Sequence, residues 1–198
     1  MMKRELLLAA AIVTIGIAVS AQRASAPKAS PTAKTTTGDA AKIREATSAG
    51  PADISKGAAV MEMDEKNGMK QLRAGTNGWT CMLVPGGPAV TDSMCMDKAW
   101  SSWTDAYMAK KNPQVKTLGI AYMLHGDHGG SNTDPFATGP TATNQWVVSP
   151  PHIMVLVPDL KLLDSLPTDP HSGGAWVMYK GTPYAHIMVP LAPVPATK

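Results

Sequence analysis

The sequence predicts an α+β fold, made of a mainly antiparallel sheet, one amphipathic helix packed on it, a short N-terminal helix and long Pro/Gly-rich loops. Three observations lead to this prediction. Residues 97–111 carry aromatic side chains at helical spacing, and short apolar runs separated by Gly-containing turns are typical of strands. In addition, 11 of the 17 prolines fall between residues 135 and 195, where helices are therefore disfavoured.

Two helices are predicted from spacing and end signals. Residues 39–49 follow Thr37-Gly38 and stop at Gly50-Pro51, which supplies a cap and a breaker. In residues 97–111, aromatic residues at i, i+3 and i+7 form one face, typical of a helix that packs on a core: Trp100, Trp103 and Tyr107. A shorter helical turn is expected over 159–166, between two prolines.

The strands are predicted from alternating apolar runs. Residues 58–63 and 69–74 flank an Asn-Gly turn, and residues 79–84 follow a second Gly-containing turn, which predicts a three-strand meander. We expect the prolines and glycines of 85–88 to end this strand, and a loop to return through Cys95 to the helix of 97–111. Residues 118–124 form a short apolar run that suits a buried strand.

The two cysteines predict a disulfide. Cys81 and Cys95 are separated by 13 residues in a chain that is expected to reach an oxidising compartment. We expect this bond to attach the helix of 97–111 to the end of the meander. A thiolate metal site built with Met94 and Met96 is the alternative.

The N-terminus predicts export. Lys3 and Arg4 precede an apolar run that ends in small residues, which is the pattern of a secretory signal peptide, assigned to 1–21. Cleavage after Ala21 is preferred to cleavage after Ala26, and an uncleaved leader is the remaining alternative. Residues 22–37 are read as a disordered tether, and 38–198 as one globular domain without a transmembrane segment. The protein is therefore expected to be periplasmic or extracellular.

The charge of the predicted domain argues against nucleic acid as a partner. Residues 38–198 contain 13 basic and 14 acidic side chains, without a basic run. Binding to a phosphate backbone depends on such a basic surface. No other class of partner is indicated by composition.

One phrase occurs twice in the last third of the chain. Residues 133–155 contain Thr-Asp-Pro, a Trp, a Pro and His-Ile-Met-Val, and residues 168–189 contain the same elements in the same order. The interval from Asp134 to His152 is 18 residues, and that from Asp169 to His186 is 17. The prolines favour strands for both His-Ile-Met-Val segments, so each His shares a strand face with the following Met.

Imidazoles and carboxylates, which here occupy equivalent positions in the two copies, are common ligands of divalent metal ions. The candidate ligands are the two Asp and two His of the doubled phrase, together with two His of the His-Gly-Asp-His segment: Asp134, His152, Asp169, His186, His125 and His128. The alternative is structural, because Asp in Thr-Asp-Pro often accepts hydrogen bonds from nearby backbone N–H groups. A solvated turn is the alternative for the second segment.

Methionine and serine supply two weaker candidates. Eleven methionines lie in the predicted domain, and soft thioethers suit Cu(I), but most sit singly among apolar residues and are interpreted as core filling. Only Met94-Cys95-Met96 is clustered. Ser172 follows His171, yet adjacent side chains on an extended segment point apart, so a Ser-His pair is disfavoured.

Three phrases resemble a type of secreted bacterial protein with no assigned function: residues 75–82 (GTNGWTCM), 131–135 (SNTDP) and 181–190 (GTPYAHIMVP). The resemblance covers most of residues 40–190. It implies no fold, ligand or activity.

The sequence therefore predicts an exported domain whose role is non-catalytic binding or an envelope-associated interaction. The main motifs of nucleophilic, nucleotide-dependent and zinc-protease catalysis are absent from the sequence. The alternative is a metal-binding protein or metal-dependent enzyme that uses the six His and Asp candidates.

Overall fold

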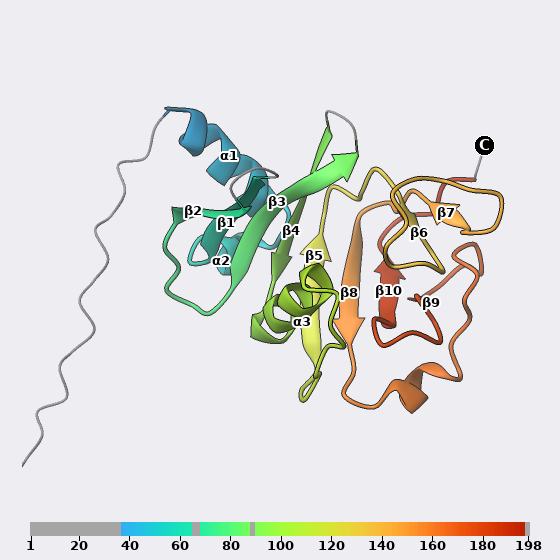
Figure 1. Cartoon of the computed structure of the whole chain (residues 1–198). Coiled ribbons are helices and arrows are strands. Elements are labelled where there is room, and N and C mark those ends of the chain that lie inside the picture. Colours follow the sequence, from blue (N-terminus) through green and yellow to red (C-terminus); the bar gives the residue numbers. More distant parts are fainter. Residues whose placement is uncertain (1–36, 65–67, 88–89, 197–198) are drawn as a thin grey trace, which may run out of the picture. The chain divides into compact units, whose positions relative to one another are not determined.

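One long sheet organises the fold (Figure 1). The computed structural model describes residues 37–64, 68–87 and 90–196, so the predicted signal peptide and the predicted tether, apart from Thr37, lie outside the described residues. Eight strands follow the order β2-β1-β3-β4-β5-β8-β10-β9. Their bounds are β1 Ala59–Asp64, β2 Gly68–Arg73, β3 Thr80–Gly87, β4 Val90–Met96, β5 Gly119–Met123, β8 His152–Leu156, β9 Trp176–Met178 and β10 His186–Pro190. Two further short strands, β6 Gly130–Ser131 and β7 Trp146–Val147, pair with each other.

The sheet is mixed, so the predicted α+β class is confirmed only in that coarse form. β1 and β3 are parallel, with Met61 opposite Met82, whereas the other neighbouring pairs of the long sheet are antiparallel. The predicted meander is wrong for this reason. β1 and β2 do form a hairpin, but the chain then crosses β1 and adds β3 on its other side.

Two segments differ from the sequence prediction because strand pairing overrides local signals. β3 continues through Pro85 and Gly86, since Pro85 pairs with Thr91 of β4, and the register shifts just beyond it. β4 itself was expected to be a loop. Its backbone hydrogen bonds to both β3 and β5 are what make it a strand.

The helices are α1 Thr37–Ser48, α2 Ala52–Ser55, α3 Lys98–Met108 and a 3₁₀ turn, η1 Leu160–Leu163. α3 begins at Asp97, whose carboxylate accepts a hydrogen bond from the Trp100 N–H. The predicted turn over 159–166 is shorter than expected, and Asp159 caps it. α2 was not predicted, because Gly50-Pro51 signals only the end of the preceding helix.

Two faces of the sheet carry different side chains. The face toward α3, called the α3 face, is largely methionine and tryptophan: Met82, Met96, Met123, Met154, Met188 and Trp176 pack with Trp100 and Trp103 of α3. The opposite face, called the α1 face, packs Val60, Cys81, Leu83 and Cys95 against Ala46 of α1. A separate cluster of Val157, Leu163, Val177 and Ala185 lies near η1.

The predicted disulfide is confirmed, but its place differs. Cys81 and Cys95 are directly opposite each other on β3 and β4, with 3.9 Å between their Cα atoms. Both lie on the α1 face, so the bond joins two strands and does not attach α3. Among the described residues no helix is long and apolar enough to cross a membrane.

Candidate functional site

The two halves of the doubled phrase meet as neighbouring strands. β8 and β10 are antiparallel, with Met154 opposite Met188 and His152 opposite Pro190. Both His side chains lie on the α3 face, as alternation predicts. However, His186 stands four positions from Pro190, which is about 13 Å along the strand. The two imidazoles are therefore at opposite ends of this strand pair and do not share one ligand position.

His186 is enclosed by aromatic rings. Trp100, Trp103 and Tyr179 place their ring centroids 5.2, 5.7 and 5.5 Å from its own. Its Nδ1 is 3.0 Å from the Tyr184 carbonyl oxygen, which accepts the hydrogen bond. Burial lowers the pKa of His186 to about 4, because the charged imidazolium loses its hydration here. At neutral pH this residue is an uncharged part of the core.

His152 is fully buried and uses only one ring nitrogen. Its Nδ1 lies 2.8 Å from the Pro150 carbonyl oxygen, so Nδ1 carries the proton and donates it. Nε2 then has a free lone pair, and no hydrogen-bond partner for it is present in the described part of the chain. Burial lowers the pKa of His152, while the carboxylates of Asp127 and Asp92 oppose this shift.

The two Asp residues of the doubled phrase have matching local roles. Asp134 Oδ1 accepts a hydrogen bond from the Phe136 N–H at 2.9 Å, and Asp169 Oδ1 accepts one from the His171 N–H at 2.9 Å. Both side chains are exposed. This is the turn-forming role that the sequence offered as the alternative to metal binding.

Asn132 connects the two copies. Its side chain accepts a hydrogen bond from Trp176 Nε1 at 3.2 Å and donates to the Thr168 carbonyl at 2.8 Å. A third hydrogen bond reaches Gln145 Oε1 at 3.1 Å. The residue before the first Thr-Asp-Pro turn thus holds the second.

The His-Gly-Asp-His segment points its two His in different directions. His125 Nε2 is 2.8 Å from the Ser48 hydroxyl at the end of α1. His128 Nδ1 is 2.6 Å from Oδ1 of Asp92 on β4, and its backbone N–H lies 3.4 Å from Oδ2. Asp92 was not predicted as part of a site, because its segment was read as a loop.

Four ionisable residues gather where β4 begins, β5 ends and β8 begins; with Ser149 they are called the sheet-end cluster: Asp92, Asp127, His128 and His152. Asp127 Oδ1 accepts hydrogen bonds from Gly129 N–H at 3.0 Å and Ser149 N–H at 2.8 Å. Burial raises the pKa of Asp127, although the Ser149 N–H and His152 act in the opposite direction. The Ser149 hydroxyl is buried and makes no hydrogen bond of normal geometry.

The structure does not bring the six predicted ligands together. His128 and His152 belong to the sheet-end cluster, His186 lies in the aromatic core, and the other three serve separate turns or contacts. Within residues 37–64, 68–87 and 90–196, no group of three or more His, Cys, Asp or Glu is placed to hold a metal ion. The divalent-metal hypothesis therefore finds no assembled ligand set in these residues.

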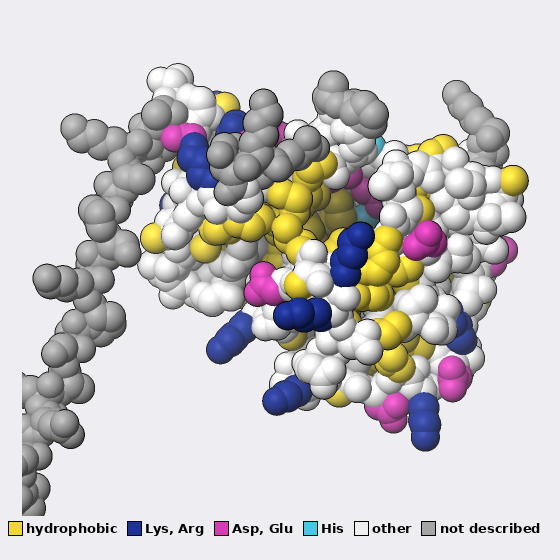
Figure 2. All heavy atoms as spheres, viewed as in Figure 1, with side chains coloured by type: hydrophobic (Ala, Val, Ile, Leu, Met, Phe, Trp, Pro, Cys, Tyr) yellow, Lys and Arg dark blue, Asp and Glu magenta, His cyan; other side chains and the backbone are white. Residues whose placement is uncertain are grey.

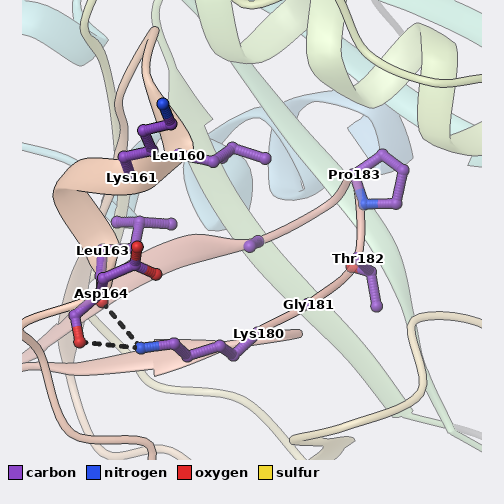
Figure 3. Close-up of a pocket in the computed structure, with 9 residues that line it drawn as sticks. Leu160, Lys161, Leu163, Asp164, Lys180, Gly181, Thr182 and Pro183 are labelled. Carbon is purple, nitrogen blue, oxygen red and sulfur yellow. Dashed lines mark hydrogen bonds between the residues drawn. The ribbon is translucent and has the colours of Figure 1, made fainter.

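Surface cavities lie elsewhere. One of about 520 Å³ lies beside η1 and is lined by Leu160, Leu163 and Thr182, among others (Figure 3). Lys180 crosses it, but its Nζ already donates to the carbonyls of Leu163 and Asp164. A second, of about 300 Å³, places Trp146 of the first copy near Asp169 and His171 of the second. Neither cavity contains a buried unpaired reactive group.

The centre of the α1 face is open. Six side chains stand there in two cross-strand rows and are called the aliphatic face: Ile120, Tyr122, Ile153, Val155, Ile187 and Val189. All six are half-buried, whereas the residues that alternate with them, such as Ala121 and Met154, are buried under α3 or its neighbours. Ile187 packs against the cluster that contains Leu163 of η1, and the Tyr122 ring lies 5.8 Å from that of Trp79. None of the described helices covers the middle of these rows as α3 covers the other side.

The α3 face is also open at one end. Figure 2 shows a hollow with hydrophobic side chains over β3 and β4 beside α3, and acidic and histidine side chains at its edge. Half-buried Met61, Met63, Val84 and Met94 belong to the apolar cluster of this face.

No protein-family model, curated protein sequence or solved structure is significantly similar to this chain.

Proposed function

We propose that this chain is an exported, non-catalytic domain that binds a partner protein through the aliphatic face. The observation that carries the proposal is the contrast along single strands: on β8, Ile153 and Val155 are half-buried, while His152, Met154 and Leu156 are buried. A regular apolar surface of this kind is typical of an interaction site.

The burial of His152 and His186 supports a non-catalytic role. General acid–base catalysis needs a group within reach of a substrate and a pKa near the working pH. His186 is enclosed by rings and has a pKa of about 4. Asp134 and Asp169 are engaged in turns, so the doubled phrase serves to build neighbouring strands and turns of the sheet.

Export is supported by the N-terminal pattern and by the disulfide. The chain has two cysteines, Cys81 and Cys95, and they form the disulfide with each other. Such bonds persist in oxidising compartments. Mass spectrometry of the protein recovered from the cell envelope or medium should find Gln22 as its first residue. Recovery from the cytosol with Met1 or Met2 intact would contradict export.

Site-specific photo-crosslinking in the producing cell tests the interaction. A photoreactive residue at Ile153 or Val155 should trap one discrete protein, whereas the same residue at Leu162, which is 62% exposed on η1, should not. Crosslinking the purified protein alone shows whether the partner is a second copy. Equal labelling from Leu162, or none from β8, would contradict the proposal. Turnover in a hydrolase screen, lost on changing His152, would contradict the non-catalytic role.

Divalent-metal binding is the second candidate, and the His128–Asp92 pair is the observation that favours it. An imidazole nitrogen lies 2.6 Å from a carboxylate oxygen there, and the His128 side chain is exposed. Two such groups, completed by water, can hold a divalent ion weakly. Elemental analysis of untagged protein and a thermal shift with Zn²⁺ test this. A shift that survives in His128→Asn would remove this pair as the site.

A further inference from the structure

A row of methionines crosses four strands on the α3 face and ends at His152. Met61 is opposite Met82, and Met82 is opposite Met94. β4 pairs with β5 through Cys95–Tyr122 and Met96–Ala121, and the next residue of each strand beyond these pairs is a methionine, Met94 and Met123. Met94 packs against the apolar cluster that contains Met123, and Met123 in turn pairs with His152. Directly opposite side chains have Cβ atoms about 5 Å apart. This spacing applies to the pairs Met61–Met82 and Met82–Met94, while Met94 and Met123 are connected through the same apolar cluster. The four residues are called the methionine row (Met61, Met82, Met94 and Met123), and their long, flexible thioethers adapt to such gaps.

The His152 imidazole presents an unused ligand atom at the end of the row. Because Nδ1–H donates to the Pro150 carbonyl, Nε2 carries a lone pair. His152 is 0% exposed, and Nε2 is without a hydrogen-bond partner among the described residues. Buried polar atoms are rarely left in this state, so an unpartnered one calls for an explanation.

Packing alone does not account for the row. Strands favour β-branched and aromatic side chains, and on the α1 face β1 and β3 do use Val60 and Leu83. On the α3 face the same strands carry Met61, Met63 and Met82, with Val84 as the β-branched member. Moreover, Met61 and Met94 are half-buried, so the row reaches the surface. A core filler needs no such access.

The surrounding charge favours a cation. Asp127 and Asp92 lie close enough to His152 to act on it electrostatically. Asp92 is on β4, two residues before Met94, and is itself 8% exposed. Thioethers and imidazole together are a soft ligand set, which selects Cu(I) over hard divalent ions.

We propose that the thioethers of Met94 and Met123, with Nε2 of His152, bind a soft monovalent cation of the Cu(I) class. Met61 and Met82 extend the row toward the surface and form the path of access. This site is separate from the aliphatic face, on the opposite side of the sheet, and does not depend on the proposed function. It requires no change of oxidation state of the bound ion.

Silver(I) is the probe, because it has the same ligand preference as Cu(I) and does not undergo redox chemistry under these conditions. Protein expressed from the complete sequence, with ¹³C-labelled methionine methyl groups and ¹⁵N-labelled histidine, is titrated with Ag(I) and followed by NMR. We expect saturation near one ion per chain, with shifts of the Met94 and Met123 methyl signals and of His152 Nε2. The methyl signal of Met108, which is 43% exposed on α3, should stay in place.

Leucine variants decide the ligand assignment. Met94→Leu and Met123→Leu should each weaken Ag(I) binding by about tenfold or more, since even outer-shell partners of metal ligands cost about 10–100-fold. Met-to-Leu exchange conserves volume and is tolerated in cores, so both variants should keep the wild-type near-ultraviolet circular dichroism. Met108→Leu is the matched control and should bind as the wild type does. Unchanged affinity in Met94→Leu and Met123→Leu, shifts spread equally over Met108, or absence of binding would each overturn the proposal.

Discussion

Because His186 is buried, this single residue makes the stability of the folded protein depend on pH. In the unfolded chain its pKa is near the ordinary 6.5, whereas in the folded protein it is about 4. Between these values the unfolded chain binds more protons, so acid favours unfolding. His152, whose pKa burial also lowers, acts in the same direction.

We therefore predict that the free energy of unfolding is highest above pH 6.5 and falls as the pH decreases toward 4. The His186 contribution is about 3 kcal/mol over the whole window. Urea denaturation at several pH values measures it. His186→Phe should flatten this part of the profile, while His125→Asn, at an exposed position, should leave the slope unchanged. Parallel profiles for wild type and His186→Phe would contradict the assignment.

Replacing Asn132 should lower the stability of the folded protein strongly. Its three side-chain hydrogen bonds connect β9, the second Thr-Asp-Pro turn and Gln145, and the one from Trp176 is buried. Removing them leaves the Trp176 indole N–H without a partner, and we expect Asn132→Ala to lose about 2–3 kcal/mol of unfolding free energy. Asn112→Ala, exposed after α3, should change it little. Chemical denaturation of the two variants makes the comparison.

At the scale of elements, local signals predicted those features that neighbours in sequence determine. The aromatic spacing predicted α3, and the Asn-Gly turn predicted the β1–β2 hairpin. The disulfide followed from two cysteines in a chain that is expected to be exported. The His side chains were correctly placed with the methionines on one strand face, because side-chain alternation is a local property.

Long-range pairing explains what the sequence did not predict. β4 is a strand because β3 and β5 flank it, although its own sequence, Val90–Met96, resembles a loop. The parallel pairing of β1 with β3 depends on a crossover that no local signal marks. The sheet-end cluster unites β4, the loop after β5 and the start of β8, so Asp92 could not be associated with His128 before the strand order was known.

The disulfide between β3 and β4 should stabilise the folded protein, because it reduces the conformational entropy of the unfolded chain. Cys81 and Cys95 lie 14 positions apart, and closing a loop of this size contributes about 3 kcal/mol in the chain-entropy model. We expect the double variant Cys81→Ala, Cys95→Ala to lose an amount of this order in urea denaturation. A thiol assay on the denatured wild-type protein should find no free thiol. Two reactive thiols would show that the bond does not form.

At the scale of the molecule, the sheet separates two kinds of apolar chemistry. Methionine and tryptophan fill the α3 face, whereas aliphatic side chains line the open centre of the α1 face. The fold thus has one side covered by α3, which supplies its main core, and one side that α1 and η1 cover only at its two ends. The proposed partner surface is the open centre of that second side.

Neighbouring residues of β8 provide a test of this division. Met154 is 6% exposed in the core under α3, while Ile153, the next residue, is half-buried on the aliphatic face. Met154→Lys places a charge in the core and should cost more than about 4 kcal/mol, enough to unfold many domains. Ile153→Lys keeps its ammonium in water and should cost about 1 kcal/mol, so the protein remains folded while partner crosslinking is lost. Thermal denaturation compares the two variants. If Ile153→Lys were as destabilising as Met154→Lys, the aliphatic face would be part of the core, because only a buried position penalises a charge so strongly.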